Sequence, residues 1–298
     1  MYSIIGANGY LGAYIRKAIL EDTNEDLICV DRVIPEAENE KRVKWINCDI
    51  SDREAADSLI EELSVYSHLK IVYLAAYHNP DLVQANPQLA WNINVTSLSY
   101  FINKACFAKE IYYPSTDSVY GESIDFYHFK ESDPLNPVNI YGHNKCAAEA
   151  IMVHSGRNVV RFPFLISPSL AGKPHFYDRI VESLKNGEPF EMYQDSYRSS
   201  LSFENAARLT VMLMEKENRH SIVNVCGDKD LSKYDVGLLL AQREGLDPNL
   251  IVPVNMGEIT VEGFVTKRAT STLMDNSLLK EILNLEYVDI FERLKFKA

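Results

Sequence analysis

The chain has 298 residues, of which 46% are hydrophobic and 24% charged, as in an ordinary globular protein. Its formal net charge of −12 argues against a nucleic-acid partner, because no basic stripe is available to neutralise a phosphate backbone. The sequence contains no run of about eighteen apolar residues, so no membrane span or membrane partner is expected. Five scattered cysteines without a C-x-x-C pair indicate a reducing, cytoplasmic location.

The first predicted strand and helix flank a glycine-rich turn. The apolar run Tyr2 to Ile5 is typical of a short buried strand, and apolar residues recur at helical spacing after the turn. Between them, GANGYLG places Gly6, Gly9 and Gly12 three residues apart. Bare backbone N–H groups and the positive end of a helix suit a diphosphate, so the turn predicts a phosphate site. A merely tight structural turn is the alternative.

Beyond this turn, strand-like and helical runs alternate along the chain. Further strands are predicted at 27–31, 43–47, 70–75, 110–114 and 158–162, and helices near 51–65, 87–109 and 141–155. This alternation is typical of a doubly wound parallel sheet, so we predict a Rossmann-like α/β fold. A capping box formed by Ser51 and Glu54 is expected to begin the helix at 51–65.

The second half of the chain is predicted to add a smaller unit. A loop rich in Ser, Pro and Gly at 167–175 precedes short elements with long connections. We therefore expect a dinucleotide-binding domain at 1–165, with a return segment at 203–228. Residues 166–202 and 229–298 are expected to form an α/β substrate-binding region.

Two adjacent residues at the end of the second predicted strand bear on the cofactor. Asp31 can accept hydrogen bonds from an adenosine ribose, which favours NAD. Arg32 could instead receive the 2′-phosphate of NADP. Both cofactors, NAD(H) and NADP(H), therefore stay open.

The segment 112–150 holds the candidate catalytic groups. Ser115 and Thr116 lie at the end of a predicted strand, and Tyr141 and Lys145 are four residues apart on one helical face. A phenol, with an ordinary pKa of about 10, transfers protons poorly at neutral pH unless a neighbouring cation stabilises its anion. Lys145 is placed to do so, and a strand-end hydroxyl can position the substrate oxygen.

Taken in order, these motifs resemble the extended short-chain dehydrogenase/reductase family, which includes NAD-dependent epimerases and dehydratases. GANGYLG resembles the cofactor fingerprint, CDI (48–50) the adenine-side pair, LAA (74–76) the motif after strand four, and NINVTSL (92–98) a helix with a structural asparagine. STDSVYG and YGHNK resemble the catalytic segments, and the resemblance implies Thr116 rather than Ser115 as the hydroxyl, because in this family it falls three residues before the Val of the V-Y-G unit. The resemblance assigns cofactor binding to Gly6, Asn8, Gly9, Tyr10, Leu11, Gly12, Asp31, Arg32, Asp49, Ile50, Leu74, Ala75, Ala76, Asn94, Tyr141 and Lys145.

The same resemblance implies where a substrate would bind. RSSLSFENAA (198–207) is similar to a family pattern whose arginine commonly meets a nucleotide diphosphate, which points to Arg198. KRATSTLMDNSLL (267–279) resembles a stretch of dTDP-4-dehydrorhamnose reductases and places Arg268 at the substrate mouth, although Ala269 replaces the expected proline. Thr116 and Asp117 are the remaining substrate candidates, Asp117 as a sugar contact or as a loop cap.

The two residues after the catalytic hydroxyl narrow the choice of reaction. Dehydratases of the family place an Asp-Glu pair there, whereas Asp117 is followed by Ser118, which disfavours dehydration. The S-T-D stretch and the small substrate region resemble 4-ketoreductases, which implies NAD(P)H-dependent reduction of a nucleotide-linked 4-dehydro-6-deoxyhexose such as dTDP-4-dehydrorhamnose, in deoxysugar or polysaccharide precursor biosynthesis. A nucleotide-sugar 4-epimerase and a non-catalytic dinucleotide-binding sensor remain alternatives.

Two further expectations concern metals and oligomers. The seven histidines form no H-x-x-x-H or H-E-x-x-H pattern, so no metal is expected. Relatives often pair through helices of the first domain, so a homodimer is expected through apolar positions in 89–102 and 147–152, unless these residues face the sheet.

Overall fold

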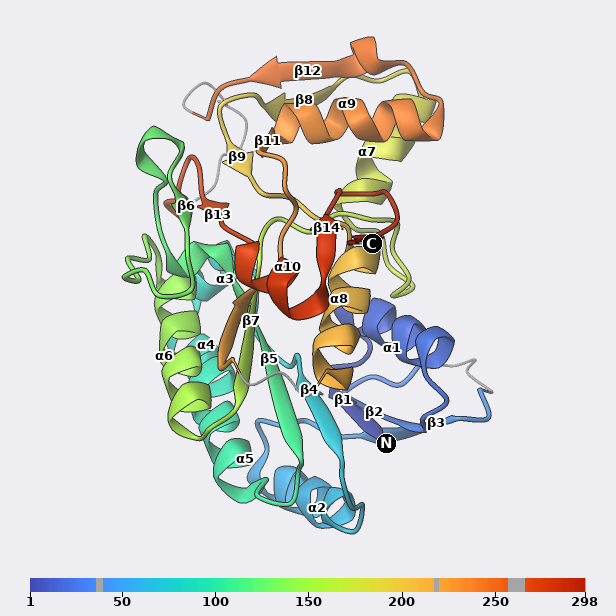
Figure 1. The fold of residues 1–298 in the computed structure, drawn as a ribbon, viewed down its shortest axis with the longest axis vertical. Helices are drawn as coiled ribbons and strands as arrows, with labels where there is room; N and C mark the ends of the chain where they lie inside the picture. The colour runs from blue at the N-terminus through green and yellow to red at the C-terminus, as the bar shows by residue number, and fades with distance from the viewer. Residues whose placement is uncertain (36–39, 217–219, 257–265, 298) are drawn as a thin grey trace.

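The computed structural model describes residues 1–35, 40–216, 220–256 and 266–297. Within these residues the centre is a parallel sheet of seven strands in the order β10-β7-β5-β4-β1-β2-β3 (Figure 1). Its strands are β1 (Tyr2–Ile5), β2 (Leu27–Asp31), β3 (Val43–Asn47), β4 (Lys70–Tyr73), β5 (Glu110–Thr116), β7 (Asn158–Phe162) and β10 (Ile222–Asn224). The chain runs outward in one direction from β1 through β2 to β3, and in the other from β4 through β5 to β10. This arrangement confirms the predicted doubly wound α/β fold.

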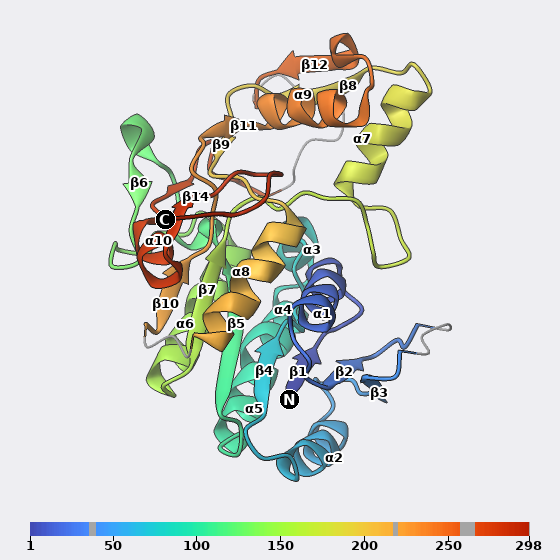
Figure 2. The same ribbon diagram turned by 45° about the vertical axis from the view of Figure 1, so that its right-hand side comes forward.

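Helices cover both faces of the sheet (Figure 2). Helices α1 and α8 contribute apolar side chains to the core on one face, and α2, α5 and α6 contribute theirs on the other. The helices of this domain are α1 (Tyr10–Asp22), α2 (Arg53–Ser64), α3 (Pro80–Ala85), α4 (Pro87–Trp91), the π-helix η1 (Asn92–Ser97), α5 (Leu98–Lys104), α6 (Ile140–His154) and α8 (Phe203–Glu215).

A smaller region lies beyond the carboxyl ends of the strands (Figure 1). Its own apolar core joins two helices to a pair of parallel strands, β8 and β12. Its elements are α7 (Phe176–Lys185), β8 (Phe190–Tyr193), β9 (Tyr197–Arg198), β11 (Leu231–Ser232), α9 (Lys233–Glu244) and β12 (Ile251–Val254). The remaining short elements are η2 (Asp117–Val119), η3 (Ile124–Phe126), β6 (His128–Phe129), η4 (Pro248–Leu250), β13 (Leu273–Met274), α10 (Ser277–Leu283), β14 (Leu285–Tyr287) and β15 (Lys295–Phe296).

The C-terminal segment differs from the expected division. Leu279, Leu283 and Leu285, from α10 and β14, are buried in the same core as α1 and α8. Residues 277–288 therefore pack against the sheet rather than within the substrate region expected at 229–298. The reason is apolar burial, because these leucines complete the layer over α8.

The start of α2 also differs from the prediction. The prediction of a capping box formed by Ser51 and Glu54 is wrong. Asp52 is the N-cap of α2, and its carboxylate accepts the Ala55 N–H at 2.9 Å. The Ser51 hydroxyl instead donates to Asp49 Oδ1 at 2.6 Å. Aspartate is as favoured as serine at an N-cap, and with Asp52 in that place the helix begins one residue later than predicted.

The expected helix at 87–109 contains an irregular turn. It forms α4, the π-helix η1 and α5, and it ends at Lys104. The Ser97 hydroxyl donates to the carbonyl five residues earlier, that of Asn92, at 2.9 Å.

Of the apolar positions expected at a dimer contact, Leu89 and Trp91 are about half exposed, whereas Ile102 and Met152 are buried.

A buried ion pair fixes α6 against the sheet. Arg161 on β7 donates from Nη2 to Glu149 Oε2 at 2.6 Å and from Nε to Oε1 at 3.0 Å. Arg161 also donates from Nη1 to the Tyr120 hydroxyl at 2.6 Å. Glu149 lies on the same helix as Tyr141 and Lys145, so the pair attaches the helix that carries both side chains to β7.

Replacing Glu149 with glutamine is expected to destabilise the protein strongly. The change leaves the Arg161 guanidinium buried without its carboxylate, which typically costs about 3–5 kcal/mol. Urea denaturation measures this loss, and Asp57→Asn is the control because its partner Lys104 is solvent-exposed. A Glu149→Gln protein as stable as the control would contradict the positioning role.

Candidate active site

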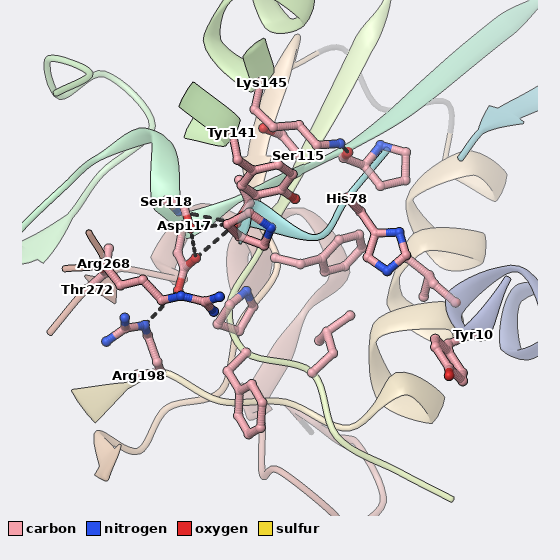
Figure 3. Close-up of a pocket in the computed structure, with 18 of the residues that line it drawn as sticks. Tyr10, His78, Ser115, Asp117, Ser118, Tyr141, Lys145, Arg198, Arg268 and Thr272 are labelled. Atoms are coloured by element: carbon pink, nitrogen blue, oxygen red, sulfur yellow. Dashed lines mark hydrogen bonds and ion pairs between the residues drawn. The ribbon is translucent and has the colours of Figure 1, made fainter. Parts of the chain in front are cut away.

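A cavity of about 510 Å³ lies where the strands end and the smaller region begins (Figure 3). Its walls come from the segments that follow β1, β4, β5 and β7, together with the start of α6. It extends from the glycine turn at Gly6 to Arg198 in the smaller region and to Arg268. One continuous space therefore joins the predicted cofactor and substrate sites.

The three glycines of the turn differ in what surrounds them. An added Cβ would lie 2.8 Å from the Ala75 nitrogen at Gly6, whose φ is +93°, and 2.7 Å from the carbonyl oxygens of Gly6 and Ala7 at Gly12. At Gly9 the nearest atom would be 3.4 Å away. Packing thus explains Gly6 and Gly12, but it does not explain Gly9, which lines the cavity. A bare backbone at Gly9 suits the close approach of a ligand.

The first turn of α1 fits a phosphate group. Gly9 is its N-cap, no side chain caps the helix, and no acidic residue lies in its first turn. The N–H groups and the positive helix end are therefore available to an anion at the cavity wall. The turn, its open Gly9 face and this helix end together fit a dinucleotide diphosphate.

Asp31 lies beside this turn. Its Oδ2 accepts the Asn8 N–H at 2.9 Å, and its Oδ1 accepts the Val33 N–H at 3.3 Å. Arg32 is largely exposed and forms an ion pair with Asp49 at 3.8 Å. The Asp31 carboxylate is therefore held in place by two backbone N–H groups, while the neighbouring Arg32 pairs with Asp49.

The predicted cofactor residues divide into two groups. Those that line the cavity are Gly6, Gly9, Tyr10, Leu11, Gly12, Leu74, Ala76, Tyr141 and Lys145. Those that do not line it are Asn8, Asp31, Arg32, Asp49, Ile50, Ala75 and Asn94. Asn94 is buried and supports the loop after β4, since it accepts the Tyr77 N–H at 2.7 Å and donates to the Tyr77 carbonyl at 3.0 Å.

Thr116, Tyr141 and Lys145 all line the cavity, and Figure 3 shows Tyr141 and Lys145 in its wall. The Lys145 ammonium donates to the Pro114 carbonyl at 2.8 Å and lies 6.0 Å from the centre of the Tyr141 ring. Ser115 is buried beside them, and its hydroxyl has no hydrogen-bond partner among the described residues. The strand end and one face of α6 thus bring the three groups together.

Burial controls the protonation of this pair. It raises the pKa of Tyr141, an effect that the Asp117 carboxylate increases and a hydrogen bond with Thr116 opposes. Burial also lowers the pKa of Lys145 to about 7, although Glu149 raises it in part. Tyr141 is therefore protonated at neutral pH, as a proton donor must be, and the Lys145 charge is sensitive to what binds nearby.

Asp117 links the catalytic strand end to the smaller region. Its Oδ1 accepts the Thr116 hydroxyl at 3.0 Å, and its Oδ2 forms an ion pair with Arg198 Nε at 3.2 Å. The Arg198 guanidinium also donates to the carbonyls of Tyr197, Thr270 and Ala269, each at 2.7 Å. Arg198 lines the cavity as expected, but most of its N–H groups already have acceptors.

Arg268 also lines the cavity and has an acidic neighbour. Its Nη2 donates to Asp81 Oδ2 at 2.9 Å, and the Thr266 N–H donates to Asp81 Oδ1 at 3.1 Å. These contacts attach the segment after residue 265 to α3. Arg268 therefore reaches the cavity from a segment that is anchored on the sheet domain.

Several cavity residues were not predicted from the sequence. Ser118 Oγ accepts a hydrogen bond from the Thr116 hydroxyl at 3.2 Å, and His78, Phe164 and Lys233 form further parts of the wall. Lys233 carries one usable signal, because it is a basic residue in the first turn of a helix, where acids are favoured. No cluster of metal-ligating side chains and no membrane-spanning helix occurs among the described residues.

The family model for the RmlD substrate-binding domain matches residues 2–295. The chain belongs to this family. Its relatives include methionine adenosyltransferase 2 subunit beta of Xenopus tropicalis, 24% identical over 94% of this chain and 81% of the relative. They also include the probable low-salt glycan biosynthesis reductase Agl14 of Haloferax volcanii, which is 24% identical over 87% of this chain and 85% of the relative.

Solved structures of similar fold cover nearly the whole of this RmlD-family chain. Pal from Bacillus thuringiensis superposes with a TM-score of 0.80 at 20% identity, over 98% of this chain and 95% of the other. A hypothetical dTDP-4-dehydrorhamnose reductase from Sulfolobus tokodaii superposes with a TM-score of 0.78 at 22% identity, over 97% of both chains. MoeE5 in complex with UDP-glucuronic acid and NAD superposes with a TM-score of 0.77 at 19% identity, over 100% of this chain and 94% of the other.

Substitutions at Gly9 and Gly12 separate ligand contact from packing in this RmlD-family turn. Gly9→Ala is expected to keep the melting temperature and to weaken NADH binding by at least about tenfold, because its methyl group obstructs the phosphate. Gly12→Ala is expected to lower the melting temperature, because its Cβ overlaps two carbonyl oxygens. Fluorescence titration with NADH and thermal denaturation test both. Unchanged NADH affinity in Gly9→Ala would refute the phosphate site.

Proposed function

We propose that the protein is an NAD(P)H-dependent reductase of the 4-keto group of a nucleotide-linked 4-dehydro-6-deoxyhexose. The observation that supports this most directly is the continuous cavity, which joins a diphosphate-type turn, the Thr116, Tyr141 and Lys145 group and a cationic far end. Family membership and the dTDP-4-dehydrorhamnose reductase among the similar structures agree with it.

In this proposal Tyr141 donates a proton to the oxygen that develops negative charge at C4. Burial keeps the phenol protonated until substrate binds, and Lys145 stabilises the phenolate that remains. Thr116, whose hydroxyl is held by Asp117 and Ser118, orients the substrate carbonyl. Bound NADH or NADPH supplies the hydride.

The residue after Asp117 disfavours a dehydratase. Relatives include the dTDP-D-glucose 4,6-dehydratase of Mus musculus, 28% identical over 60% of this chain and 52% of the relative. In this chain the position after Asp117 carries the Ser118 hydroxyl, whose Oγ lies 3.2 Å from Thr116 Oγ1. The pair of carboxylates that would serve as the acid for the leaving water and the base for the neighbouring carbon is therefore incomplete.

Two other functions keep specific support. The UDP-glucuronic acid 4-epimerase of Bacillus cereus superposes with a TM-score of 0.77 at 17% identity, and an epimerase would use the same Thr116, Tyr141 and Lys145. One relative is named as a subunit, methionine adenosyltransferase 2 subunit beta, which supports the alternative of a non-catalytic dinucleotide-binding sensor. The reductase is preferred over that role because the complete proton-transfer group lines the cavity.

We also propose a homodimer through the helices opposite α1 and α8. Leu89 and Trp91 on α4 and Val153 on α6 are 41–49% exposed, although they are large and apolar. Their helices contact each other on the molecular surface of the sheet domain. Burial of this apolar surface against a second copy would stabilise the pair.

Tyr141→Phe tests the reductase proposal. The variant is expected to lose about 10²–10⁴-fold in kcat, the usual contribution of a general acid, while NADH affinity is retained. Nucleotide-linked 4-dehydro-6-deoxy sugars are offered with NADH or NADPH, loss of reduced cofactor is followed, and the product is identified. Tyr127→Phe, an exposed tyrosine outside the cavity, is the control. Near-normal turnover by Tyr141→Phe would contradict the assignment.

Asp31→Asn tests cofactor choice. The fixed Asp31 carboxylate repels a 2′-phosphate, and Arg32 is paired with Asp49, so we propose a preference for NADH. Asparagine can still accept the Asn8 N–H but carries no charge. The ratio of kcat/KM for NADPH to that for NADH should rise by at least about tenfold, or about 1.4 kcal/mol. A wild type that already prefers NADPH would refute the assignment.

A further inference from the structure

Lys233 lines the cavity from an electrostatically unfavourable position at the start of a helix. It is the first residue of α9, and a cation there opposes the helix dipole. The helix is already capped, because the Ser232 hydroxyl accepts the Asp235 N–H at 3.0 Å. The Lys233 ammonium instead lies 3.4 Å from the ring centre of Phe164, which lines the same cavity.

The charges at this end of the cavity are unbalanced. Arg198 has its carboxylate in Asp117, and Arg268 has Asp81. Among the residues that the structure describes, Lys233 forms no salt bridge; its described contact is the cation–π contact with Phe164. A cation facing a cavity without a carboxylate partner is costly until an anion arrives, even in a chain with a net charge of −12.

We propose that Lys233 binds the diphosphate of the nucleotide-sugar substrate. Arg198, the residue expected in that role, has most of its donors engaged by Asp117 and three carbonyls, whereas the Lys233 ammonium has three rotatable donors. The inference rests on the proposed function, because it requires a nucleotide-linked substrate. It adds a specificity residue in the smaller region that none of the family motifs contains.

The surroundings of Lys233 give this contact a pH dependence. Burial and the cations Arg198 and Arg268 lower the pKa of Lys233 to about 7, while Asp117 raises it. His175 also faces this group, but burial lowers its pKa, so it stays neutral above pH 7. The Lys233 charge is therefore lost as the pH rises above about 7 in the free protein, and diphosphate affinity should fall with it.

Calorimetric titration of the NADH-loaded protein tests the inference. dTDP and UDP are the probes, and thymidine and uridine are the matched ligands without phosphate. Lys233→Met is expected to lower the affinity for both diphosphates by about 10- to 100-fold and to leave the affinity for the nucleosides unchanged. Lys229→Met, an exposed lysine paired with Asp289 outside the cavity, should bind as wild type does.

A second variant separates charge from structure. Lys233→Arg should retain diphosphate binding and lose less affinity than the wild type between pH 7 and 8.5, because its guanidinium stays charged while Lys145 still titrates in both proteins. The melting temperature of Lys233→Met should not fall, because the substitution removes a charge that burial disfavours. These two results would exclude a purely structural role for Lys233.

The outcomes separate this inference from the proposed function. If the wild type binds and reduces nucleotide sugars while Lys233→Met binds dTDP and UDP equally well, the role of Lys233 is refuted and the reductase stands. If the NADH-loaded wild type binds neither diphosphate yet reduces a nucleotide-linked 4-dehydro-6-deoxy sugar, the role of Lys233 alone is refuted. If it also reduces none of these sugars, both proposals are refuted. A selective loss of diphosphate affinity in Lys233→Met, with rescue by arginine, supports both.

Discussion

Parallel pairing is the constraint on which the whole site depends. Because β1, β4, β5 and β7 run in the same direction, the segments that follow them meet at one edge of the sheet. The glycine turn, the loop after β4 and the Thr116 strand end come together there. Helix α6 then brings Tyr141 and Lys145 to the same edge, and the buried pair of Glu149 and Arg161 fixes its position. Chain direction thus assembles a site from segments more than a hundred residues apart.

The substrate end of the cavity is rich in cations, although the chain as a whole is negatively charged. The protein is acidic, yet its far wall carries Arg198, Lys233 and Arg268 against the two carboxylates of Asp81 and Asp117. Burial lowers the pKa of both cavity lysines, Lys145 and Lys233, to about 7. An anionic ligand would therefore restore charge to groups that the fold alone leaves partly neutral.

Local patterns made much of this predictable from the sequence. The strands at 27–31, 43–47 and 158–162 coincide with β2, β3 and β7, because these short segments are rich in β-branched and aromatic residues, which favour strands. The Tyr141 and Lys145 spacing is a property of a single helix. The prediction of Ser51 as the helix cap is wrong because Asp52, a residue type equally favoured at an N-cap, follows it directly, and the capping pattern does not decide between the two. Apolar leucines at 279–285 join the sheet core through contacts with α8, which periodicity cannot reveal.

Residues of the substrate end were the least predictable. Arg198 was found by its motif, but its acceptors Ala269 and Thr270 lie about seventy residues further along the chain. Lys233 belongs to no motif, and only its unfavourable place at a helix start distinguishes it from a surface lysine. Contacts between distant segments decide what these cations bind, and such contacts are a property of the folded chain.

The most direct test of hydride transfer uses NADH deuterated at the transferred position of C4. With a nucleotide-linked 4-dehydro-6-deoxy sugar, a reductase of the proposed type places one deuterium on C4 of the sugar for each NADH oxidised. Mass spectrometry and proton NMR of the product report the label and its position. Product without deuterium, or sugar isomers formed without oxidation of the added NADH, would contradict the reductase and favour an epimerase.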